Sequence, residues 1–130
     1  MDPASALADL TEISSQVRSV VVFEDGGSVL ASTWGDGDSA ARLARIGHDL
    51  LSAAAVMPLG SRRVTQVEVA MAIGSVFVVR DGDRGIAATA AAGSLSGLVL
   101  YDLRSCLGAL AKDPELLADT QSEQPSTADA

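Results

Sequence analysis

One stretch of the chain has the composition of a phosphate-binding loop. Residues 86–104, IAATAAAGSLSGLVLYDLR, run from small apolar residues through Gly93 and Gly97 into a helical pattern. Strand, glycine-rich turn and helix form the arrangement that holds phosphate in nucleotide-binding folds. The spacing of the two glycines matches neither G-x-G-x-x-G nor the P-loop pattern, and the only lysine of the chain is Lys112. The sequence therefore argues against a phosphate site, and a structural role must explain these glycines.

The other reactive side chains do not combine into a catalytic site. His48 and Asp49 are adjacent in a helical pattern, so their side chains diverge, and a surface or interface histidine is expected instead. Cys106 lies on the apolar stripe of the last helix, where a free cysteine ordinarily packs as a small hydrophobic residue. One cysteine and one histidine cannot form a zinc-type cluster. We therefore predict a protein that is not an enzyme and carries no cofactor or metal.

Several polar and aromatic groups each allow two interpretations. Four arginines could supply an arginine finger to a GTPase partner, or they could simply be solvated. They are Arg62, Arg63, Arg80 and Arg84. Trp34 could anchor an interface or cap the core beneath a loop. The DGD triplets at 36–38 and 81–83 resemble the start of a calcium loop but lack its closing glutamate, which favours simple turns.

Length and composition indicate one domain without nucleic-acid or membrane partners. The chain has 130 residues, of which 48% are hydrophobic, and this is enough for a single core. Its net charge is −8, and residues 113–130 hold five acidic residues and no basic one. Neither part offers a basic surface that would attract nucleic acid or anionic lipid. A single cysteine and an amino terminus without a signal-peptide pattern predict a cytoplasmic protein.

Hydrophobic periodicity predicts three helices. They cover residues 4–17, residues 40–56 and a segment from about residue 96, and Asp2 is placed to cap the first. Apolar residues at spacings of three and four mark the face that each helix buries. These residues are Leu7, Leu10, Ile13 and Val17 in the first helix, Leu43, Ile46, Leu50 and Ala54 in the second, and Val99, Leu103, Cys106, Leu107 and Leu110 in the third.

Alternating and continuous apolar runs predict five strands. Residues 19–33 read as a β-hairpin with its turn at 24–27, and a second hairpin turns at Asp81-Gly82. The run VFVV in that hairpin indicates a strand covered on both faces. Between them, residues 64–73 alternate, with Val67 on one face and Gln66 on the other.

The predicted order of elements is α-β-β-α-β-β-β-α. Hairpin-length connections force antiparallel pairing, so we predict an α/β (α+β) domain in which helices cover a five-stranded antiparallel sheet. This domain spans residues 1–112. Residues 113–130 form an acidic tail, rich in Ser, Thr and Gln, that we expect to be disordered from about residue 117.

This order resembles the roadblock (dynein light chain) domain family, whose fold is profilin-like. The resemblance covers residues 4–112. It includes the leading helix before VRSVVVFEDGGSVLAS, the alanine-rich helix 40–56, the strand VTQVEVAMAIGSVFVV and the small-residue entry AAAGSLSGLVLYDLR into the last helix. In that setting Gly93 and Gly97 let the fifth strand turn sharply into the last helix, and the preceding alanines let the helix lie close to the sheet.

The resemblance implies a partner-binding protein. Bacterial roadblock proteins are typically homodimers that bind a small Ras-like GTPase, in some cases stimulating its hydrolysis, often beside a sensor kinase-like protein. We therefore expect a homodimeric regulator or scaffold for such a GTPase. The alternative is a small-ligand sensory α/β module, against which stands an aromatic content of 3%.

The predicted dimer pairs two copies of the strand 64–73, which the family places at a sheet edge, and sets helix 40–56 beside its mate. An unprotected edge strand without proline, lysine or glycine would otherwise promote aggregation. Near the two-fold axis Glu68 would meet its own copy, and Arg62 or Arg63 of the partner would have to offset the repulsion. The predicted interface residues are Ala40, Leu43, Ala44, Gly47, Leu50, Ala54, Gln66, Glu68 and Ala70.

Overall fold

A computed structural model describes residues 2–24, 26–34, 37–57 and 65–111. The predicted tail, residues 113–130, lies outside the described residues, as do Arg62, Arg63 and Val64. The elements follow the predicted order. They are α1 (Pro3–Ile13), β1 (Val17–Glu24), β2 (Val29–Ser32), α2 (Gly37–Ala55), β3 (Gln66–Met71), β4 (Gly74–Asp81), β5 (Arg84–Ala91) and α3 (Ser96–Ala111).

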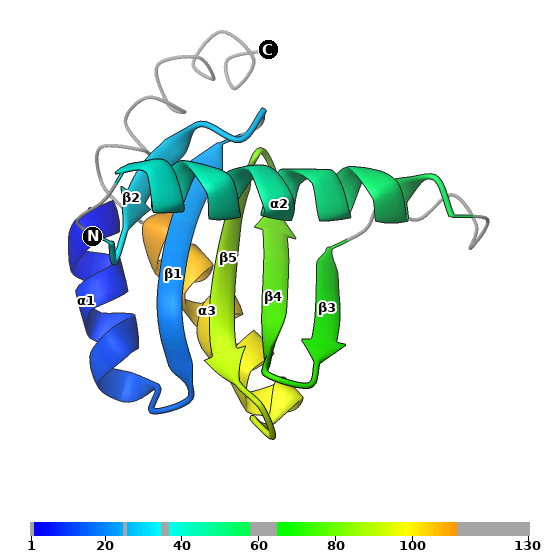
Figure 1. Cartoon of the computed structure of the whole chain (residues 1–130). Helices are drawn as coiled ribbons and strands as arrows, with labels where there is room; N and C mark the ends of the chain where they lie inside the picture. The colour runs from blue at the N-terminus through cyan, green and yellow to red at the C-terminus, as the bar shows by residue number, and fades with distance from the viewer. Residues whose placement is uncertain (1, 25, 35–36, 58–64, 112–130) are drawn as a thin grey trace, which may run out of the picture.

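The five strands form one antiparallel sheet in the order β2-β1-β5-β4-β3. The edge strands are therefore β2 and β3. Helix α2 crosses one face of the sheet, and α1 and α3 cover the other (Figure 1). The predicted fold class is confirmed. None of the helices within the described residues is both long enough and apolar enough to cross a membrane.

Each face of the sheet has its own core because strand side chains alternate. Val20, Val22 and Phe77 belong to the cluster beneath α1 and α3. Val21 and Val78 belong to the cluster beneath α2. The VFVV strand is therefore covered on both faces at its centre, as the uninterrupted apolar run predicts.

Helix α2 is longer than the sheet is wide. Its 19 residues span about 28 Å at 1.5 Å per residue. The outer strands of a five-stranded sheet lie only about 19 Å apart. Figure 1 shows the carboxyl end of α2 extending past the edge strand β3. The large side chains at this end, Val56 and Met57, are 83% and 57% exposed.

The first helix and the β3 strand are shorter than predicted. Asp2 caps α1 by accepting a hydrogen bond from the Ser5 backbone N–H at 2.8 Å. The helix ends at Ile13, which is 76% exposed, and Val17 begins β1 instead of continuing the helical stripe. Strand β3 ends at Met71 because the next two residues form the tight turn into β4.

Turn chemistry also refines the predicted loops. The second hairpin turns at residues 82–83, one position later than predicted, because Asp81 and Arg84 still pair as strand residues. Gly82 supplies the positive φ, at 65°. Gly93 likewise has φ 81° in the turn that follows β5. Gly97 lies inside α3, where an added Cβ would meet nothing within 4 Å, so the prediction that Gly97 forms part of this turn is wrong.

Candidate protein-interaction surfaces

The β3 strand leaves one row of backbone groups unpaired within the described chain. The Arg80 N–H donates to the Thr65 carbonyl oxygen at 2.8 Å, so position 65 pairs inward with β4. Inward and outward residues alternate along an antiparallel strand. The backbone N–H and C=O groups of Gln66, Glu68 and Ala70 therefore point to the open edge. These are the three edge positions that the sequence predicts.

The side chains of two of these residues fix the edge strand to α3. Arg104 Nη1 donates to Gln66 Oε1 at 2.7 Å, and Ser96 Oγ donates to Glu68 Oε2 at 2.7 Å. The Glu68 carboxylate thus lies at the first residue of α3, where the helix dipole favours negative charge. Glu68 has a partner within its own chain, which the sequence does not reveal.

Helix α2 presents a different surface from the one predicted. Four of its predicted interface residues, Ala40, Leu43, Ala44 and Gly47, are buried against the sheet of their own chain. They have almost no surface left for a partner, so their assignment to the interface is corrected to the core. Of the predicted residues on α2, Leu50 and Ala54 remain half-buried.

The exposed apolar surface of α2 lies a fraction of a turn away from its buried stripe. Ile46, predicted to face the core, is 43% exposed, and Leu51 is buried in its place. Ile46, Leu50 and Ala53 follow one another at spacings of three and four, so they share one side of the helix, and Met57 continues this spacing two residues past the end of α2 at Ala55. We call these four residues the α2 flank. The helix is apolar on two adjoining sides, which is why its periodicity alone misplaced the core-facing stripe.

The described residues do not assemble the catalytic groups considered from the sequence. Asp49 Oδ2 lies 3.9 Å from Arg45 Nε, one helical turn away, and His48 is half-buried beside it. Cys106 is buried, and its Sγ donates to the Ala6 carbonyl oxygen at 3.7 Å. Burial, with a contribution from the charge of Asp9, raises the pKa of the Cys106 thiol to about 11. Among the residues that the structure describes, no cluster of His, Cys, Asp and Glu could hold a metal ion.

The remaining candidates take structural positions. Trp34 packs against the core beneath α2 and thus caps it. Arg80 and Arg84 are half-buried at the ends of β4 and β5, and Arg84 Nε is buried without a hydrogen-bond partner in the described chain. Of the alanines before α3, Ala88 and Ala90 face α1 and α3, whereas Ala87 lies beneath α2.

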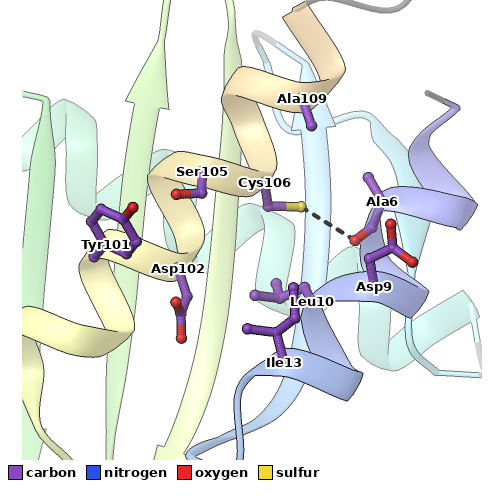
Figure 2. Close-up of a pocket in the computed structure, with 9 residues that line it drawn as sticks. All are labelled: Ala6, Asp9, Leu10, Ile13, Tyr101, Asp102, Ser105, Cys106 and Ala109. Atoms are coloured by element: carbon purple, nitrogen blue, oxygen red, sulfur yellow. Dashed lines mark hydrogen bonds between the residues drawn. The ribbon is translucent and has the colours of Figure 1, made fainter.

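A cleft of about 250 Å³ lies between α1 and α3 (Figure 2). Its lining residues are Ala6, Asp9, Leu10, Ile13, Tyr101, Asp102, Ser105, Cys106 and Ala109. The volume is below the roughly 300–1,000 Å³ of typical small-molecule pockets. Asp102 is not among the site residues predicted from the sequence. Asp102 lies three residues after Val99 and four before Cys106, which places it on the apolar stripe of α3. An acidic residue on an apolar stripe is the signal by which it could have been found.

Solved structures supply the comparison with known proteins, since no family model and no curated protein matches the chain. A Roadblock/LC7 domain from Streptomyces avermitilis is similar, with a TM-score of 0.78 and 21% identity over 90% of this chain and 99% of that one. The gliding protein MglB from Thermus thermophilus gives a TM-score of 0.68 and 16% identity, covering 85% and 89% of the two chains. A structure of MglB with a tetrameric arrangement gives 0.69 and 18%, covering 85% and 88%. The chain therefore has the Roadblock/LC7 fold.

Proposed function

We propose that this protein is a homodimeric regulator or scaffold that binds a small Ras-like GTPase in the cytoplasm. The observation that carries the proposal is the open edge of β3 beside the projecting, exposed carboxyl end of α2, in a chain with the Roadblock/LC7 fold. The GTPase partner, and a sensor kinase-like protein as a further partner, rest on the family resemblance of the sequence.

A second copy of the chain fits the β3 edge. Antiparallel pairing of two β3 strands satisfies the outward backbone groups of Gln66, Glu68 and Ala70 on both copies. The same two-fold axis brings the projecting end of each α2 toward the other copy, where the exposed Val56 and Met57 find apolar partners. A dimer of this kind buries both features at once.

The least favourable feature of this proposed interface is the negative charge at its centre. Two copies of Glu68 lie close together when the axis passes near this residue, and both side chains are on the α3 face. Each Glu68 carboxylate is held by Ser96, and Arg104 brings positive charge to the same face through its bond to Gln66. Arg104 therefore joins Arg62 and Arg63 as a group that offsets the repulsion.

The two arginines of the β4–β5 hairpin are poorly placed to act as arginine fingers. This favours scaffolding, or regulation by other means. An arginine finger must extend into the nucleotide site of its partner. Arg80 and Arg84 are half-buried, and the Nε atom of Arg84 is inaccessible. Any stimulation of hydrolysis would then come from ordering the GTPase, or from Arg62 or Arg63, and not from these two side chains.

The dimer is tested by proline at position 66. Gln66→Pro removes an outward N–H donor and leaves the hydrogen bonds to β4 intact, so light scattering at about 50 µM is expected to give a folded monomer. Gln66→Ala is the matched control, because it loses the Arg104 contact but keeps the donor, and it is expected to remain a dimer. An unmodified protein that is monomeric under these conditions contradicts the proposed interface.

The GTPase partner is tested with purified small Ras-like GTPases of the source organism, each loaded with GDP or with a non-hydrolysable GTP analogue. Calorimetry is expected to detect binding of at least one of them, with a preference for one nucleotide state. Phosphate release with GTP then separates stimulation from scaffolding. Failure of every GTPase to bind the dimer contradicts the proposed function.

A further inference from the structure

The cleft between α1 and α3 is acidic as well as apolar. Asp9 comes from α1 and Asp102 from α3, and none of the nine lining residues is basic. The remaining walls are mainly aliphatic, from Leu10, Ile13 and the alanines. Helices α1 and α3 lie on the face of the sheet opposite α2 (Figure 1), so the cleft between them is separate from the α2 flank.

Asp102 is the unusual group in this cleft. Its side chain is directed into the space between α3 and the carboxyl half of α1 (Figure 2). The residue is only 9% exposed, and within the described chain no hydrogen bond or ion pair holds its carboxylate. The carboxylate oxygens are not fully enclosed by the domain, so they face the open space of the cleft. An apolar residue at this place on the helix would extend the core, so the packing of the domain itself does not require a charge here. A positively charged group from outside the domain would satisfy the carboxylate.

We propose that the α1–α3 cleft binds a lysine or arginine side chain carried by an apolar segment of a partner protein. Its volume of about 250 Å³ suits a single long side chain. The aliphatic stem would lie against Leu10 and Ile13 while the charged end meets Asp102 and Asp9.

The exposed residues around the mouth of the cleft favour a protein segment over a free small cation as the ligand. Ile13 is 76% exposed, Tyr101 62% and Leu98 46%, so α1 and α3 offer apolar surface on both sides of the charged site. Hydrophobic neighbours of a lysine or arginine would cover this surface, and the Tyr101 ring can also contact the cation. The chain's own residues 113–130 have the wrong charge for this site, because they hold five acidic residues and no basic one.

Blocked synthetic peptides with one lysine between leucines are the probes for this site. Titrated up to about 10 mM into isotopically labelled full-length protein, the lysine peptide is expected to shift the amide resonances of α1 and α3 around the cleft. A peptide with norleucine in place of lysine is expected to bind at least about tenfold more weakly, since a hydrogen bond to a charged group is lost. Butylamine, the free-cation probe, is expected to bind more weakly than the lysine peptide.

Asp102→Asn tests the carboxylate itself. This variant is expected to keep the melting temperature, because the carboxylate makes no hydrogen bond or ion pair within the described chain, and to weaken the lysine peptide at least about tenfold. Asp83→Asn, which removes an exposed carboxylate from the β4–β5 turn, is the matched control and is expected to bind normally. The proposal is overturned by equal binding of lysine and norleucine peptides, by equal binding to Asp102→Asn, by butylamine that binds as well as the peptide, or by no shifts around the cleft.

Discussion

At the scale of single residues, the core beneath α2 is closed by one aromatic ring between two glycines. A Cβ added at Gly85 of β5 would lie 2.5 Å from the Cζ of Phe23, and one added at Gly47 of α2 would lie 3.1 Å from the same ring. The missing side chains on both sides leave the space that Phe23 fills. The helix can approach the sheet closely here because neither glycine carries a Cβ.

Gly85→Ala is predicted to destabilise the fold by about 1–3 kcal/mol, because the added methyl group overpacks the site of the Phe23 ring. Combining it with Phe23→Leu is expected to cost less than the sum of the two single changes, since the smaller side chain makes room. Urea unfolding of the single and double variants measures this. Gly97→Ala is the control, with no loss of stability expected in the open part of α3.

Cys106 is predicted to be unreactive in the folded protein. Burial raises its pKa from the ordinary 9.0 to about 11, so near pH 8 the thiolate population is about a hundredfold lower than in the unfolded chain. The raised pKa contributes stability that is complete below pH 9 and is lost as the pH rises toward 11. Thiol labelling at pH 8 is expected to be slow until urea is added. Equal rates with and without urea contradict the burial of this group.

At the scale of elements, local patterns predicted most of the fold. Glu24 and Gly26 mark the first hairpin by turn chemistry, and Val99 with Leu103 marks the buried stripe of α3, which the structure confirms. The extent of α1 was overestimated, because Val17 continues the helical spacing by chance. Spacing alone cannot distinguish a helical residue from the start of a strand.

The candidate site was less predictable than the fold. The outward register of Gln66 follows from alternation, but the side-chain bond between Glu68 and Ser96 joins residues far apart in sequence. From the sequence alone, the core-facing side of α2 could not be distinguished from the α2 flank, which contains Ile46, because both sides are apolar. The isolation of Asp102 depends on how α1 packs against α3, and no local pattern encodes that packing.

The junction between β5 and α3 is predicted not to bind nucleotide. Phosphate is attracted to a helix N-terminus by free N–H groups and positive potential. Here the Glu68 carboxylate is bonded to Ser96 at the start of α3, so an incoming phosphate would meet a negative charge. Calorimetry with GTP and GDP is expected to show no binding. Micromolar affinity for either nucleotide contradicts this account of the glycine-rich stretch.

At the scale of the whole molecule, the two faces of the sheet separate the two proposed interactions. In the two proposals, the β3 edge and the α2 flank meet a second copy of the chain, and a basic segment of a partner enters between α1 and α3, which lie on the other face of the sheet (Figure 1). Both faces share the central strands β1, β5 and β4 as their rigid support. A dimer with this arrangement would carry two such clefts, so partner segments linked to one another could bind both.

Removing residues 117–130 is predicted to leave the domain stable. All residues of both core clusters lie between Ala6 and Leu110, and the removed segment has no apolar periodicity with which to extend them. Thermal melts of the full-length and shortened proteins are expected to agree within about 2 °C, since 1 kcal/mol corresponds to about 4–8 °C for a domain near this size. A larger fall means that this segment packs on the domain. Repeating the lysine-peptide titration on the shortened protein then shows whether the segment covers the α1–α3 cleft, because tighter peptide binding after truncation would identify it as a competitor.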